Sequence, residues 1–306
     1  MPTSAVQASS QSEFKLTQRP QGSLVDALFA PRRRPIGTPP APPGSRAGSR
    51  IYLPVSASEE QQAISQGARK GPKGGIFIAA DGDLAAFEPW LPFYAREFVE
   101  PLCVDLIPST SWGGSLANLL TASSWDKLRQ PALSRTNGVC VVCGLAGGNG
   151  KAVHCHEVWE YHLPLAGEIG AQKLVGILPV CKLCHEMFHL GRAAMEGRLD
   201  RALSRLAWAN RWSAAEVDAC HRYAGTKWRE RSQRLWTLDL SMLGAEAKLS
   251  LKGGATGVRV DGEGNLRYES SQGAGVTRLT GAPFTSGGVV YGPFGAPDYR
   301  KFRKDV

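Results

Sequence analysis

Cysteine and histidine are concentrated in one part of this 306-residue chain. Five of the seven cysteines and five of the six histidines lie between positions 140 and 189. Four of these cysteines form two CxxC pairs with 37 residues between them, Cys140/Cys143 and Cys181/Cys184. Two residues between cysteines allow both thiolates to turn toward one ion, and two such pairs complete a tetrahedral zinc site. The spacing therefore predicts a closed, structural zinc site with four cysteine ligands.

Histidines around the second cysteine pair predict a separate, open metal site. His185 and His189 are four residues apart, which places both on one face of a helix. His156 lies in a segment with strand character, where alternation puts His154 on the same face and Glu157 on the other. A strand histidine and two helical histidines can offer three nitrogens to one divalent ion and leave positions for water and phosphate. This donor set is typical of a catalytic metal site.

The arrangement resembles the ββα-metal (HNH) nuclease family. Two CxxC pairs bracket a strand histidine, and Cys181-Lys-Leu-Cys184-His185-x-x-x-His189 matches the last element of the family motif. The stretches PSTSWGGSLANLL, SSWDKL, HCHEVWEYH and LVGILPVCKLCHEMFHLGRA are similar to a subgroup of bacterial and phage HNH endonucleases. The resemblance covers residues 104–245 and is tightest over 140–192.

The resemblance implies a fold and a set of site residues. It implies a zinc-stabilised ββα-metal domain whose catalytic ion, such as Mg, Mn, Ni or Zn, is held by His156, His185 and His189. The residue after the first ligand is a histidine general base in the family, and here it is Glu157. A carboxylate can also deprotonate water, and His154 is an alternative ligand or base. The family's middle asparagine is replaced by Gly176.

Two functions follow as alternatives. The first is a metal-dependent endonuclease that hydrolyses phosphodiester bonds in nucleic acid, with DNA favoured as the substrate. The second is a non-catalytic, zinc-stabilised nucleic-acid-binding or adaptor protein of a mobile element. The intact HxxxH favours the enzyme, whereas Glu157 and Gly176 favour the binding module.

The region before this metal-binding part predicts a small βαβα domain over residues 49–95. Strands are expected at 51–55 and 74–80, a helix between Ser58 and Gly67, and a short closing helix at 83–92. The pattern resembles a small domain of unknown function in bacterial plasmid and mobile-element proteins. The matching stretches are YLPV, Glu60, Ala63, GAR, IFIAADGDL, Phe87 and Trp90. Two aromatic positions of that domain are changed here, and a protein partner bound through 49–95 is an open alternative.

We expect an α+β chain with five parts. Residues 1–48 form a disordered Pro/Arg-rich tail, 96–134 a connector, 135–247 the HNH-like zinc domain with a helical extension, and 248–306 a Gly-rich, mostly disordered basic tail. Residues 199–247 are expected to be helical, and a capping box at Ser213 and Glu216 begins one helix of this extension. Its apolar stripe is Val217, Cys220, Ala224 and Trp228.

The net charge of +9 comes from the N-terminal and C-terminal parts of the chain. Residues 1–50 hold seven Lys/Arg against two Asp/Glu, 248–306 hold nine against five, and the middle is neutral. Basic tails suggest nucleic acid, although solvated cations explain them equally well. The candidate contact residues are Arg32, Arg33, Arg34, Lys227, Arg229 and Arg231.

Membrane and secretory classes are not expected. The chain has no apolar run long enough to span a bilayer, and its start lacks the basic and apolar regions of a secretory signal. We therefore expect a cytoplasmic protein with reduced cysteines and no membrane partner.

Overall fold

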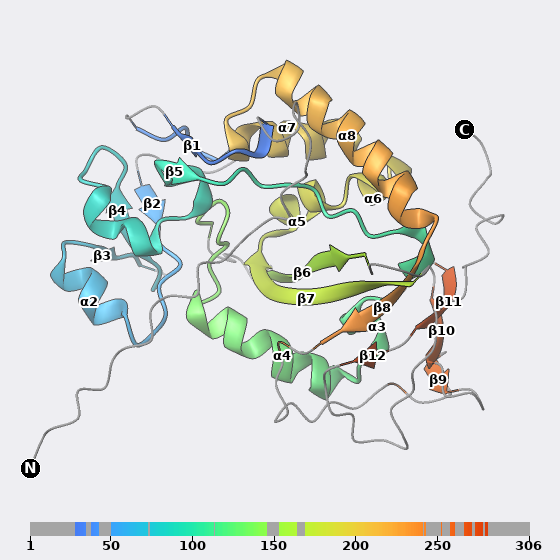
Figure 1. Cartoon of the computed structure of the whole chain (residues 1–306). Helices are drawn as coiled ribbons and strands as arrows, with labels where there is room; N and C mark the ends of the chain where they lie inside the picture. The colour runs from blue at the N-terminus through green and yellow to red at the C-terminus, as the bar shows by residue number, and fades with distance from the viewer. Residues whose placement is uncertain are drawn as a thin grey trace, which may run out of the picture.

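The computed structural model describes residues 28–34, 38–42, 50–72, 74–112, 114–145, 153–163, 169–240, 242 and 252, together with short strands between 258 and 280. It is a mixed α+β structure of small sheets and helices (Figure 1), as expected from the sequence. Within this described part of the chain, no helix has both the length and the apolar character needed to cross a membrane.

A three-stranded sheet forms near the N-terminal end of the described chain. Its order is β2 (Arg50–Tyr52), β4 (Ile76–Ala79) and β3 (Arg69–Lys70), and both pairings are antiparallel. Helix α2 (Glu60–Ser65) and the 3-10 helix η1 (Ala85–Trp90) contribute buried residues to the same core as this sheet. One face of β2 and β4 is buried, so the apolar residues on that face form the core of this region. The aromatic residues of η1 complete this core.

This region differs from the expected βαβα pattern in three details. Strand β3 was not expected, and the closing helix is of the 3-10 type. The N-cap of α2 is Glu59, one residue later than the expected Ser58. Gly67 ends the helix as expected, with a φ of +107°, a conformation that favours glycine because it has no Cβ.

The central sheet has four strands. In order across the sheet they are β12 (Leu279–Thr280), β8 (Leu235–Asp239), β7 (Ile169–Val180) and β6 (His154–His162). Strands β6 and β7 pair antiparallel, with a register shift between Val158 and Trp159, whereas β8 pairs parallel to β7. Strand β8 lies in a region expected to be helical, so that part of the expectation is wrong.

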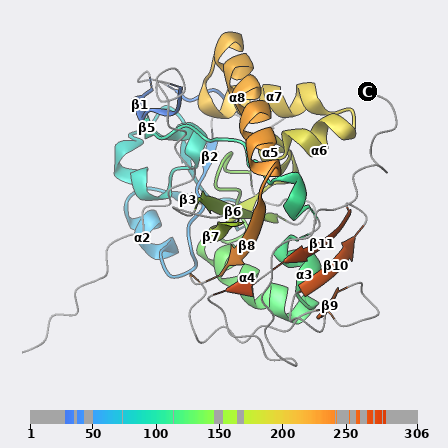
Figure 2. The same ribbon diagram turned by 45° about the vertical axis from the view of Figure 1, so that its right-hand side comes forward.

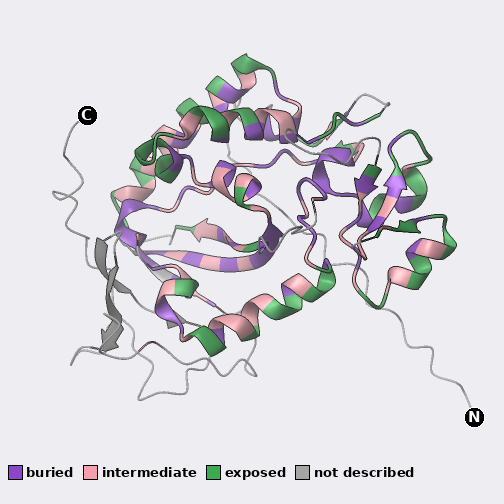
Figure 3. Cartoon of the chain, turned by 180° about the vertical axis from the view of Figure 1, so that it is seen from behind, coloured by how far each residue is buried: buried purple, intermediate pink, exposed green. Residues whose placement is uncertain are grey.

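Helices cover both sides of the central sheet. In Figures 1 and 2, α5, α7 and α8 lie on one side of β6 and β7, and α4 lies on the other. Figure 3 shows β7 buried or half-buried along its visible length, which is the pattern of a strand covered on both faces. The helices of this region are α3 (Leu116–Leu119), α4 (Ala122–Arg135), α5 (Lys182–Phe188), α6 (Leu190–Met195), α7 (Leu199–Asn210) and α8 (Ala214–Ser232).

Helix α8 begins with the expected capping box. The Ser213 hydroxyl accepts from the Glu216 backbone N–H, and the Glu216 carboxylate accepts from the Ser213 backbone N–H. Both contacts satisfy donors that a helix start leaves unpaired. The stripe that follows is buried at Val217, Cys220 and Ala224, so the expected helix and its inward face are confirmed.

Residues 28–34 differ from the disorder expected of the N-terminal tail. Strand β1 (Arg32–Arg33) pairs antiparallel with β5 (Phe98–Val99). Phe29 is buried against the rings of Trp212 and Tyr223, with centroids 5.8 Å away in each case. Residues 28–34, which contain a large apolar side chain and, after Pro31, a basic run, therefore pack against the helical part of the molecule.

The Gly-rich C-terminal region also contains paired strands. Strand β9 (Val258–Val260) pairs antiparallel with β10 (Leu266–Ser270). Strand β11 (Gly273–Thr277) extends this sheet. Of the rest of residues 248–306, only Lys252 and the two residues of β12 are described. Two short 3-10 helices, η2 (Phe93–Ala95) and η3 (Ser109–Ser111), follow η1 along the chain.

Candidate metal centres

The four cysteines of the two CxxC pairs come together. One Sγ atom from each of Cys140, Cys143, Cys181 and Cys184 lies within 4.8 Å of the others. Cys140 and Cys143 lie in the turn after α4, while Cys181 is the N-cap of α5 and Cys184 is in its first turn. All four are free thiols, and all but Cys181 are buried. The expected cluster is confirmed, and it could hold a structural zinc ion.

A glycine shapes the first cysteine turn. Gly144 has a φ of +65°, and its backbone N–H donates to the Cys140 carbonyl at 2.9 Å. A Cβ on this residue would lie 2.5 Å from the carbonyl oxygen of Tyr52 in β2. Only glycine fits this close approach, so the turn and the N-terminal sheet are positioned together.

Arg205 in α7 also contacts the cysteine cluster, which the spacing of the cysteines alone did not reveal. Its Nε and Nη2 donate to Cys184 Sγ at 3.3 and 3.2 Å, and its guanidinium lies 4.4 Å from the centroid of the Trp208 ring. Burial disfavours the charged guanidinium, but the nearby Cys184 and Cys143 sulfurs outweigh it and raise the pKa of Arg205. If the cluster holds a zinc ion, the charge of Arg205 would offset part of the negative charge of the four thiolate ligands.

Three histidines form a second cluster beside the first. Ring nitrogens of His156 in β6, His185 in α5 and His189 at the end of α5 lie within 4.8 Å of one another. The Nε2 atoms of His185 and His189 are 3.1 Å apart, and the His156 ring stacks on Phe188 with centroids 4.4 Å apart. The three residues that the sequence singled out as ligands are therefore brought together.

The environment of this cluster suits metal binding. Burial lowers the pKa of His185 to about 4 and that of His189 to about 3, and it lowers the pKa of His156 well below its usual value. All three imidazoles are therefore neutral near pH 7, which is the form that coordinates metal ions. Within the described chain His156 Nδ1 is buried with no hydrogen-bond partner.

His154 lies at the exposed edge of the three-histidine cluster. Its Nδ1 is 3.3 Å from Nδ1 of His185, and the ring centroids are 5.3 Å apart. It shares a face of β6 with His156, as strand alternation predicts. It is not one of the three clustered ligands, so it remains available for another role.

Glu157 is placed differently from its expected role as the general base. Its carboxylate accepts a hydrogen bond from the backbone N–H of Leu116 in α3 at 2.9 Å, on the opposite face of β6 from His154 and His156. Burial raises the pKa of Glu157 to about 7, opposed by hydrogen bonds from the Leu116 and Ala117 backbones. The carboxylate anchors the connector to the sheet and does not face the three histidines.

Gly176, at the position of the family's asparagine, lies opposite Val158 beside the register shift of the β6–β7 pair. A Cβ built on it would meet only Val158 atoms, at 3.8 Å. The backbone therefore leaves room for a side chain here, and no crowding explains the glycine.

The basic residues expected to contact nucleic acid are largely engaged within the fold. Arg34 is buried and donates to the carbonyls of Phe93 and Ala209 at 2.6 and 2.7 Å. Arg32 pairs with Glu216 at 2.7 Å, and the exposed Arg33 pairs with Glu97.

The second basic group, in α8, is divided between the interior and the surface. The Arg231 guanidinium lies 4.0 Å from the centroid of the Tyr161 ring, and Lys227 pairs with Glu230 at 2.6 Å. Arg229 is exposed and has a Thr226 hydroxyl at 3.5 Å. Of this group, Lys227 and Arg229 are therefore the better placed for an external anion.

Comparisons with protein-family models, with curated proteins and with solved structures find no match to this chain. The function must therefore be inferred from the site itself. It consists of a four-cysteine cluster and a three-histidine cluster beside the β6–β7 hairpin and the helices that follow it.

Proposed function

We propose that this protein is a metal-dependent endonuclease of the HNH type that hydrolyses phosphodiester bonds in nucleic acid, with DNA as the favoured substrate. The observation that carries the proposal is the convergence of one strand histidine, His156, with two helical histidines, His185 and His189. The order of hairpin, cysteine pair and helix around them supports a ββα-metal unit. The four cysteines would hold a structural zinc ion whose removal unfolds this unit.

The two clusters suit different metals and roles. Four thiols can fill every position of a tetrahedral zinc ion, which leaves nothing for a substrate. Three neutral imidazoles leave coordination positions open, as catalytic sites do. A divalent ion held there would stabilise the negative charge that develops on a scissile phosphate. Mg²⁺, Mn²⁺, Ni²⁺ and Zn²⁺ are the candidates to test.

His154 is the best-placed base for the attacking water. It is exposed, whereas the three ligands are buried or half-buried, and it adjoins His185 on the same face of the site. An imidazole can take a proton from water near neutral pH, where general bases work best. Glu157, on the opposite face, keeps a structural role in this mechanism.

A plasmid-nicking assay with each of the four metals tests the proposal. The wild type should convert supercoiled DNA to nicked or linear forms with at least one metal. A His185→Ala/His189→Ala variant should lose this cleavage while keeping its zinc, because the cysteine cluster is separate. A wild type that cleaves nothing with any metal would contradict the proposal.

A non-catalytic nucleic-acid-binding or adaptor module is the second candidate. The placement of Glu157 away from the three histidines, and glycine at 176, favour it. Retardation of DNA in a gel without cleavage would support this module. A protein captured through residues 49–95 would support the adaptor form of it.

A further inference from the structure

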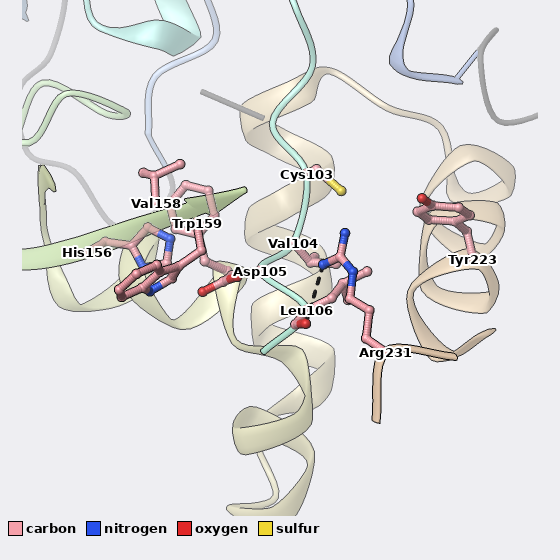
Figure 4. A pocket seen from close by; sticks show the side chains of 10 residues that line it. Cys103, Val104, Asp105, Leu106, His156, Val158, Trp159, Tyr223 and Arg231 are labelled. Carbon is pink, nitrogen blue, oxygen red and sulfur yellow. Dashed lines mark hydrogen bonds between the residues drawn. The ribbon is translucent and has the colours of Figure 1, made fainter. Parts of the chain in front are cut away.

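A small pocket adjoins His156 on a side that neither His185 nor His189 lines. Its volume is about 40 Å³, which is enough to hold water. Figure 4 shows His156, Trp159 and Asp105 on one side of this pocket and Arg231 across from them. The pocket thus joins a predicted metal ligand to a carboxylate from the connector.

Asp105 is held firmly in this place by its backbone. Its N–H donates to the carbonyl of Phe188 at 2.8 Å, and Phe188 immediately precedes His189 and stacks on His156. The Oδ2 atom of Asp105 is buried and has no hydrogen-bond partner within the described chain. Burial raises the pKa of Asp105 to about 8, and the positive charge of Arg231 opposes this shift. A buried polar oxygen of this kind is normally satisfied by a protein group or an ordered water.

We infer that Asp105 is a positioning residue for His156. Through water in the pocket, a carboxyl oxygen of Asp105 accepts a hydrogen bond from the ring nitrogen of His156 that does not face the other two histidines. This contact fixes the tautomer and the orientation of the ring, so that the remaining nitrogen presents its lone pair toward the cluster. The inference rests on the proposed metal site and adds a residue to it.

The chemistry of metal-bound histidine explains why such a partner is needed. A ligating imidazole commonly donates its other N–H to a carboxylate or to water, and losing that partner weakens metal binding roughly 10- to 100-fold. His156 has no other carboxylate among the residues that line this pocket. Glu157, the neighbouring acid, points to α3 and cannot serve.

The test compares the wild type with Asp105→Asn, which keeps the size but replaces one carboxyl oxygen with an amide NH₂ group. Long-range proton–nitrogen NMR on protein with zinc in the cysteine site and no second metal reports the His156 tautomer. A single tautomer in the wild type and a mixture in the variant are expected. Titration of Ni²⁺ into the same samples should show an affinity lower by roughly 10- to 100-fold in the variant.

The matched control is Asp218→Asn, because Asp218 is an exposed acid of α8 whose partner is Arg222. It should leave both readouts unchanged. If Asp105→Asn does not retain zinc, Asp105→Ser replaces it. An unchanged His156 tautomer overturns the inference and leaves Asp105 as a partner of Arg231 alone. A wild type that binds no Ni²⁺ at the histidines overturns the proposed function, while the tautomer comparison still decides the role of Asp105.

Discussion

The imidazole of His154 and the carboxylate of Glu157 extend from opposite faces of β6, three residues apart. Only His154 reaches the edge of the three-histidine cluster, at 3.3 Å from His185. We predict that His154→Ala lowers the metal-dependent cleavage rate by roughly 10²- to 10⁴-fold, the range of a lost general base. Glu157→Gln should cleave at nearly the wild-type rate, because its carboxylate contacts α3. Single-turnover cleavage of a plasmid measures the rates of both variants. A slow Glu157→Gln variant and a fully active His154→Ala variant would identify Glu157 as the general base instead.

The residues that define the two clusters could be predicted because their spacing is local. A CxxC turn and an i, i+4 pair in one helix fix side-chain direction within a few residues. Asp105 and Arg205 could not be found in this way. They reach the sites from segments 51 and 21 residues away from His156 and Cys184, and only tertiary packing brings them there. A lone acid in a connector carries no local pattern that separates it from a surface residue.

At the scale of elements, Arg205 connects α7 to the first turn of α5. Two N–H···S contacts to Cys184 link the helix to the cysteine cluster. Arg205→Lys keeps a positive charge but removes the planar pair of donors. We predict that it weakens zinc retention by roughly 10- to 100-fold in competition with a chelator.

Two variants calibrate that measurement. Arg222→Lys on the exposed face of α8 should retain zinc like the wild type. Cys181→Ser should lose the ion altogether, and with it the folded structure around the cluster. Arg205→Lys with wild-type zinc retention would show that the sulfur contacts add nothing to the site.

Helix α8 and strand β8 show where prediction from local sequence patterns succeeds and where it fails. The capping box at Ser213 predicted α8 correctly because it is a local arrangement of hydrogen bonds. Strand β8 was missed because the short segment LWTLD follows a long helix and has little periodicity of its own. Its strand conformation depends on parallel pairing with β7, which lies more than 50 residues earlier. Such non-local pairing overrides local propensity.

At the scale of the whole molecule, the described part of the N-terminal region joins the helical part of the fold. Phe29 is 2% exposed and packs on Trp212 and Tyr223. Arg34 donates to carbonyls on both η2 and α7, and Arg32 pairs with the capping residue Glu216. The arginine run therefore contributes to the cohesion of the molecule, which a tally of charge along the chain does not reveal.

This arrangement predicts that Phe29 contributes to the stability of the whole molecule. The variant Phe29→Ala in the full chain should lower the free energy of unfolding by about 3–5 kcal/mol, as expected for a large buried aromatic residue. Urea denaturation of zinc-loaded protein, followed by tryptophan fluorescence, measures the change. Phe98→Ala is the matched control, because Phe98 is exposed and its loss should cost far less. Equal midpoints for Phe29→Ala and the wild type would show that the Phe29 ring adds nothing to stability.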